Sequence, residues 1–201
     1  MILTVQQSKQ LLQTELEKAM LSFEGYNISD DIKTWVYKKS IPHPYLVYEA
    51  AKKIRKNDKT IEIIKSLGLD IERANQIIDI NALLHDLGRL IEVELETGLF
   101  KQNFEHAIES YEILKEHGID DPCVLLPIKY HNLLDFREKL FIDPEYQNLS
   151  NRDKDAVIFF SEQIADADKL GNIVEVAKVG LEGRQGILDG RYKNEAEITP
   201  I

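Results

Sequence analysis

The sequence has few of the residues that build disulfides or membrane spans. Its 201 residues include one cysteine, Cys123, so no internal disulfide can form and no oxidising compartment is required. The first residues do not combine a basic stretch with an apolar run, and no segment approaches the roughly 18 consecutive apolar residues of a membrane helix. We therefore expect a soluble, cytoplasmic protein with no membrane partner.

Basic residues are also few relative to acidic ones. The chain has 25 Lys and Arg against 35 Asp and Glu, which gives a formal net charge of −10. Such a charge argues against long nucleic acids as partners, because a phosphate backbone attracts basic surfaces. Apolar residues make up 43% of the chain, which is enough for a packed core and argues against a disordered chain. A chain of this length is expected to form one domain.

The apolar residues recur three and four positions apart, in segments separated by proline and glycine. This periodicity is typical of amphipathic helices, so we predict an all-α fold, a single-domain helical bundle. Helix boundaries are expected at an Asp70 N-cap, an Asn103 cap with an end at Gly118, Pro122 at a helix start, and Ser150 with Asp153 in a capping box. The expected helices include residues 11–20, 32–36, 45–54, 71–84, 108–114, 125–128 and 157–167.

The most informative segment is Ala82-Leu-Leu-His85-Asp86-Leu-Gly88-Arg89. It places an imidazole and a carboxylate at the end of an otherwise apolar helix, where burial is costly unless both groups are satisfied. A divalent metal would satisfy them. Taken alone, the pair is also compatible with a histidine that bonds the carbonyls of its own helix end. Both interpretations stay open at this point.

Four further residues with metal-binding side chains lie in or beside helical segments. They are His43, His106, His131 and Asp168. The remaining histidine, His117, precedes Gly118 among charged residues, which is typical of a solvated helix end.

With these residues the sequence resembles the HD superfamily of metal-dependent phosphohydrolases. The pattern there is a first His, a His-Asp pair and a late Asp on helices of an all-α domain. The segments that match are His43-Pro-Tyr-Leu-Val-Tyr-Glu-Ala-Ala, the His85-Asp86 segment, and Asp166-Ala-Asp168-Lys-Leu, and the resemblance covers about residues 41 to 175. It implies that His43, His85, Asp86 and Asp168 hold one metal ion.

The closing aspartate involves a choice between Asp166 and Asp168. Two residues apart on a helix, their side chains point about 200° apart, so only one of them faces a given site. We favour Asp168, because it precedes Lys-Leu as the family element requires.

Two-metal branches of the superfamily add two histidines between the His-Asp pair and the last Asp. They include dinucleoside-polyphosphate hydrolases, cyclic-dinucleotide phosphodiesterases and di-iron oxygenases. His106 and His131 stand in that order here. The resemblance therefore implies two divalent ions, which could be Fe, Mn or Mg, with Asp86 as the bridging, catalytic carboxylate.

The activity implied by the resemblance is hydrolysis of a phosphate ester or anhydride of a small anionic substrate, foremost a nucleotide, by a metal-activated hydroxide. Substrate-binding roles are expected for Arg89, Lys169 and Asn172, although a solvated arginine, a surface lysine and a helix-capping asparagine are the respective alternatives. The competing function is a di-iron oxygenase of the same superfamily acting on a polyol or phosphonate. A ligand-binding module without turnover is a third hypothesis.

The resemblance also divides the chain into three parts. Residues 1–40 are expected to be N-terminal helices packed on the core, and residues 41–182 the HD domain. From 183 to 201 the helical periodicity is lost around several glycines and a proline, so we expect an irregular tail.

Overall fold

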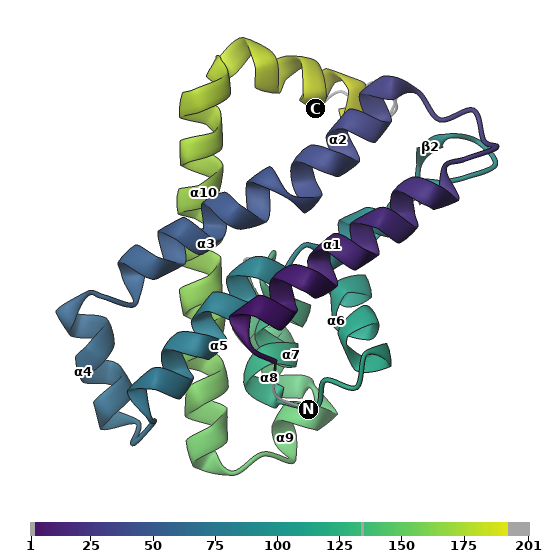
Figure 1. Cartoon of the computed structure of the whole chain (residues 1–201). Coiled ribbons are helices and arrows are strands. Elements are labelled where there is room, and N and C mark those ends of the chain that lie inside the picture. Colours follow the sequence, from purple (N-terminus) through teal and green to yellow (C-terminus); the bar gives the residue numbers. More distant parts are fainter. Residues whose placement is uncertain (1–2, 134, 193–201) are drawn as a thin grey trace, which may run out of the picture.

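The computed structural model describes residues 3–133 and 135–192, and their side chains as far as residue 177. Nearly all of the regular structure is helical, which confirms the all-α fold (Figure 1). The helices are α1 (Val5–Ser22), α2 (Asp30–Ser40), α3 (Pro42–Ile54), α4 (Asp58–Ser66), α5 (Ile71–Leu84), the 3₁₀ helix η1 (Leu87–Ile91), α6 (His106–Glu116), α7 (Pro122–Tyr130), α8 (Phe136–Ile142), α9 (Pro144–Gln147) and α10 (Asn151–Tyr192). A short antiparallel hairpin joins β1 (Val93–Glu94) to β2 (Leu99–Phe100).

Most of the expected helix boundaries are present. The Asp70 side chain accepts the backbone N–H of Arg73 at 2.7 Å and caps α5, and Pro122 is the first residue of α7. The Ser150 hydroxyl accepts the backbone N–H of Asp153 at 3.2 Å where α10 begins. Gly118 follows α6 with φ +74°, a conformation that glycine adopts without strain and that ends helices.

The expected Asn103 cap is wrong, because α6 begins three residues later at His106. Asn103 instead has φ +54° in the preceding turn, and asparagine tolerates this left-handed region better than most residues. The sequence analysis also missed α4 and the hairpin. The two strands have only two residues each, which is too short for a period of two to be recognised.

The expected irregular tail is also partly wrong. Helix α10 continues to Tyr192, and Figure 1 shows that it bends on the way. Glycine costs a helix only about 1 kcal/mol per residue, so its presence does not by itself end a helix. The remainder of that segment, residues 193–201, lies outside the described residues.

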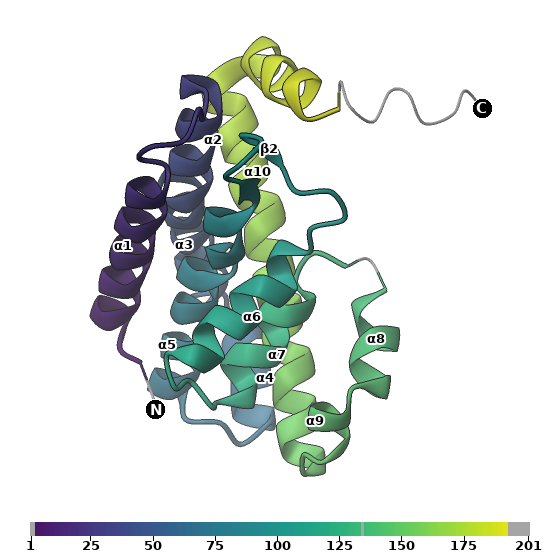
Figure 2. The ribbon, with the colours of Figure 1, turned by 90° about the vertical axis from the view of Figure 1, so that its right-hand side faces the viewer.

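The core joins the N-terminal helices to the rest of the molecule. Leu12 of α1 and Val36 of α2 are fully buried in the same cluster as Val47 of α3 and Ile164 of α10. Figure 2 shows α10 running between α1 on one side of the molecule and α8 on the other. Within the described residues, no helix combines the length and the apolar character needed to span a bilayer.

Helix α3 packs closely against α10 at Gly171. A Cβ atom added to this glycine would lie 2.6 Å from Val47 Cγ2 and 3.2 Å from Val47 Cα, which is too close for an undisturbed contact. The absence of a side chain therefore allows the two helices to approach. This approach matters because His43 lies at the start of α3 and Asp168 lies one turn before Gly171.

We expect Gly171→Ala to lower the free energy of unfolding by about 1–3 kcal/mol, because the added methyl group overpacks the contact with Val47. Val47→Ala removes the clashing methyl groups, so the double variant should be more stable than the sum of the single effects predicts, by about 1 kcal/mol or more. Chemical denaturation of the four proteins in this cycle measures the coupling. Strictly additive effects would contradict the proposed contact.

Candidate metal centre

The centre is built around the end of α5. The helix ends at Leu84, and the backbone N–H of His85 still bonds Asn81 O at 3.0 Å. Asp86 then leaves the helical conformation, with φ −105° and ψ 17°, and η1 begins at the next residue. This change of backbone direction places the His85 and Asp86 side chains in one buried space.

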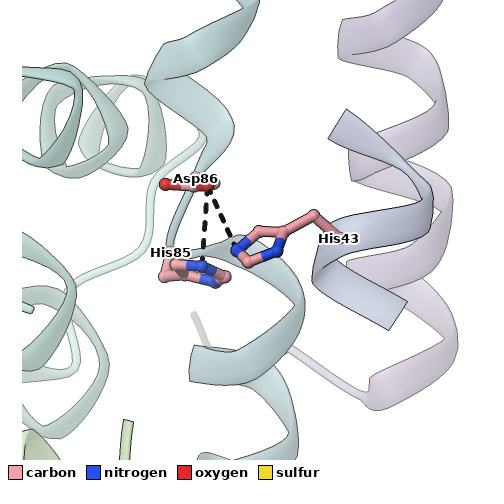
Figure 3. A group of neighbouring side chains, drawn as sticks. All are labelled: His43, His85 and Asp86. Carbon is pink, nitrogen blue, oxygen red and sulfur yellow. Dashed lines mark ion pairs between the residues drawn. The ribbon is translucent and has the colours of Figure 1, made fainter. Parts of the chain in front are cut away.

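The Asp86 carboxylate has histidines on both of its oxygens. Oδ2 lies 3.7 Å from Nε2 of His43 and 3.7 Å from Nε2 of His85. Dashed lines mark these two contacts in Figure 3. Oδ1 lies 3.3 Å from Nε2 of His106 and 3.6 Å from Nε2 of His131. The structure thus brings together two groups of possible metal ligands, His43–His85–Asp86 and Asp86–His106–His131, which share one carboxylate.

The structure places Asp168, and not Asp166, at the first group. Asp168 Oδ1 lies 3.0 Å from His43 Nε2 and 3.7 Å from His85 Nε2. The Asp166 side chain is 66% exposed and lies 3.9 Å from the ammonium of Lys169. The two aspartates therefore face in different directions, as their separation by two residues on a helix requires.

Backbone carbonyls orient two of the imidazole rings. His85 Nδ1 lies 3.0 Å from Ala82 O, and His131 Nδ1 lies 2.8 Å from Ile128 O. A carbonyl only accepts, so Nδ1 must carry a proton in both rings, and Nε2 is the nitrogen that faces Asp86. Such partners commonly fix the tautomer of histidines that bind metal.

His43 is oriented by a carboxylate that the sequence analysis missed. Its Nδ1 lies 3.1 Å from Glu175 Oε2, and this oxygen also accepts a hydrogen bond from Lys39 Nζ at 2.9 Å. Glu175 lies seven residues, or about two turns, after Asp168, so both occupy one face of α10. That spacing is the signal that could have found it.

The donor set fits a divalent metal ion. Nε2 of His85 is buried without a hydrogen-bond partner, and it lies 3.7 Å from one oxygen of Asp86 and from one of Asp168. Ligands about 2.1 Å from one ion are about 3 Å apart at right angles, close to the spacing of these atoms. Imidazole and carboxylate ligands suit first-row divalent ions.

Comparison with protein families agrees with this geometry. The family model described as HD domain matches residues 40–173. The chain belongs to the HD domain family. Searches of curated proteins and of solved structures find no match.

Serine and glycine bring the second group of this HD domain together. The Ser110 hydroxyl accepts the Gly88 N–H at 2.8 Å and lies 2.8 Å from the carbonyl oxygens of both His85 and His106. A Cβ atom on Gly88 would lie 2.1 Å from His106 O. The glycine therefore lets η1 approach α6, which carries His106 to Asp86. Ser110 was not identified from the sequence.

The protonation of the histidines differs between the two groups of possible metal ligands in the HD domain. Burial disfavours a charged His43, but its hydrogen bonds to Asp168 and Glu175 outweigh this and raise its pKa to about 9. Burial lowers the pKa of His106 to about 3 despite the nearby Asp86. Burial alone would raise the pKa of Asp86, but Arg89 and His85 hold it well below its usual range. At neutral pH, His43 is therefore protonated, whereas His106 is neutral and Asp86 is ionised.

The three residues with expected substrate roles have different surroundings. Arg89 lies in the centre, with Nε 3.4 Å from Asp86 Oδ2. Asn172 donates to Asp168 Oδ1 at 2.9 Å, so it orients a candidate ligand. Lys169 is exposed and lines a separate cavity of about 680 Å³ together with Lys53 and Lys59.

His117 lies on α1's side of the molecule, outside both groups of the HD domain. Its Nε2 lies 3.0 Å from Glu15 Oε1 of α1. This helix end was expected to be solvated, but its histidine forms an ion pair with Glu15 when the imidazole is protonated. His117 therefore provides a natural control for the four histidines that are candidate metal ligands.

We expect Glu175→Gln to lower the pKa of His43, because the variant removes a negative charge that stabilises the imidazolium. Lys39→Met should raise it, since the Lys39 charge opposes protonation of His43. NMR titration of the His43 ring, in protein stripped of metal by a chelator, measures both shifts. Shifts in the same direction for the two variants would contradict the arrangement.

Metal binding to the His43 group should depend on pH. Below pH 9 an ion must displace the proton of His43. The affinity of the His43 group for the ion should therefore rise about tenfold per pH unit and level off near pH 9. Calorimetric titration with Mn²⁺ between pH 6.5 and 9.5 tests this. In His43→Ala the ion left in the other group should lack this dependence, because His106 is already neutral. An equally steep pH dependence in that variant would refute the assignment.

Proposed function

We propose that this HD domain is a metal-dependent phosphohydrolase that cleaves a phosphate ester or anhydride of a small substrate, foremost a nucleotide. The observation that carries the proposal is the position of Asp86, whose two oxygens each face a different group of histidines. Membership of the HD domain family supports the same class of reaction. The substrate itself is inferred from the chemistry of the site.

Two divalent ions bound to these groups would lower the pKa of a bound water and offset the charge of phosphoryl oxygens. The protein itself would keep the Asp86 carboxylate ionised and orient the ligand side chains toward the ions. Asp86 stays a carboxylate because its pKa is held well below the usual range. Asn172 and the Glu175–His43 pair orient the ligands of the first group.

We assign to Arg89 the role of binding the substrate's anionic oxygens. Its guanidinium is a planar fork of donors, which matches a phosphate as well as a carboxylate. The side chain is 14% exposed and lies against Asp86, next to the ligands. Lys169 lines a different cavity, so we give it no part in binding the reacting phosphate.

The surface charge supports a small substrate. The net charge of −10 repels long polyanions, whereas divalent ions and Arg89 would make the centre locally attractive to one phosphate group. A nucleotide or a similar phosphate ester satisfies both conditions.

The ligand set of four histidines and two aspartates also suits a di-iron oxygenase acting on a polyol or phosphonate. Iron binds imidazole and carboxylate ligands as readily as manganese does. The two functions differ in their need for oxygen, which an assay separates.

The decisive assay measures phosphate release from a panel of nucleotides and other phosphate esters under anaerobic conditions. The protein is first stripped of metal and then reloaded with Mn²⁺, Fe²⁺ or Mg²⁺. We expect metal-dependent release that falls more than about 100-fold in His85→Ala, because a ligand is lost, and persists in the matched His117→Ala control. Elemental analysis should find about two ions per chain in the parent protein.

Two results would overturn the proposal. The first is the absence of phosphate release for every ester and metal in a folded protein that holds two ions. The second is oxygen consumption on addition of a polyol or phosphonate to the iron-loaded protein, which would establish the oxygenase instead.

A further inference from the structure

The guanidinium of Arg89 contacts one of the proposed metal ligands directly through its terminal nitrogen. Its Nη2 lies 3.2 Å from His106 Nε2, its Nη1 donates to Glu92 Oε2 at 2.9 Å, and its Nε lies 3.4 Å from Asp86 Oδ2. Arg89 thus joins the shared carboxylate to a histidine of the second group.

The contact with His106 fixes the role of Nε2. A guanidinium has donors and no acceptor, so Nε2 must accept with its lone pair, and the ring proton lies on Nδ1. The same nitrogen lies 3.3 Å from Asp86 Oδ1, so it is the one that would bind an ion in the Asp86–His106–His131 group. An imidazole nitrogen has one lone pair, which serves either the guanidinium or a metal ion.

The surroundings keep Arg89 at this position. Its Cζ lies 5.7 Å from the centre of the Trp35 ring, a distance typical of cation–π contacts. Trp35 is itself buried and packs edge-on against Phe100 of the hairpin, with ring centres 4.7 Å apart. The anchor on Glu92 is a charge-assisted hydrogen bond, so the guanidinium is held beside His106 from two sides.

We propose that Arg89 competes with the metal ion of the Asp86–His106–His131 group for the lone pair of His106 Nε2. An ion binds this group fully only when the guanidinium leaves His106, and its affinity is reduced by the cost of breaking that contact. The proposal rests on the two-ion centre of the proposed function. Within the described part of the chain, Arg89 makes no corresponding contact with His43 or His85, so the competition is specific to one group.

The test isolates the ion held by His106. In a His43→Ala background the other group lacks a ligand, and Mn²⁺ binding to the metal-stripped protein is followed by calorimetry. Adding Arg89→Met should tighten binding about 10- to 100-fold, the range expected when a competing charge-assisted hydrogen bond is removed. Adding His106→Ala to that double variant should abolish the gain.

The control for charge alone is Lys39→Met in the same background. It removes one positive charge at the edge of the centre, where Lys39 pairs with Glu175 and does not touch His106. We expect a change in Mn²⁺ affinity of less than about threefold, as for a partly exposed pair. A gain equal to that of Arg89→Met would overturn the proposal, and so would unchanged affinity in Arg89→Met.

A second measurement covers the case in which Arg89→Met fails to fold, which circular dichroism would reveal. The Arg89 side-chain N–H signals are then followed by NMR in the His43→Ala protein as Mg²⁺, a diamagnetic ion, is added. A shift that saturates with binding of the ion supports competition, whereas unchanged signals on binding refute it. Neither measurement uses a substrate, so failure of the competition and failure of the phosphohydrolase are separate results.

Discussion

One buried carboxylate organises the site. Asp86 is 4% exposed, and taking a carboxylate out of water costs several kcal/mol unless other groups compensate. Here Arg89 supplies a compensating positive charge, and imidazoles lie beside both oxygens, one pair for each. The fold brings these groups, which are far apart in the sequence, to the two carboxylate oxygens of Asp86.

Two of the helix contacts around Asp86 depend on a close approach at a glycine. Helix α3 lies against α10 because Gly171 leaves room for Val47, and α6 lies against η1 because Gly88 leaves room for the His106 carbonyl. Both glycines act through the absence of a side chain and not through an unusual backbone angle. The Ser110 hydroxyl then hydrogen-bonds the backbone carbonyls of His85 and His106. The two groups of possible metal ligands are therefore connected through Ser110 as well as through Asp86.

The predictable part of the structure is the part encoded locally. The helical period, the cap at Asp70 and the helix start at Pro122 depend on neighbouring residues, and the ligand candidates were accessible through the resemblance to the HD superfamily. Glu175 and Ser110 were missed because their roles arise only from packing between helices. The irregular tail expected from residue 183 is wrong as far as Tyr192, because glycine weakens a helix without forbidding it.

The positive charge of Arg89 has two consequences that follow from one geometry. Beside Asp86 and Glu92 it stabilises buried carboxylates, which would otherwise repel each other. The donor that it directs at His106 is of the kind that a phosphate oxygen accepts. A guanidinium displaced from His106 by an ion would therefore have a donor available for an anionic substrate in the same place. Binding of the ion would free the guanidinium for the anion, and binding of the anion would hold the guanidinium away from His106. Each ligand would therefore favour binding of the other.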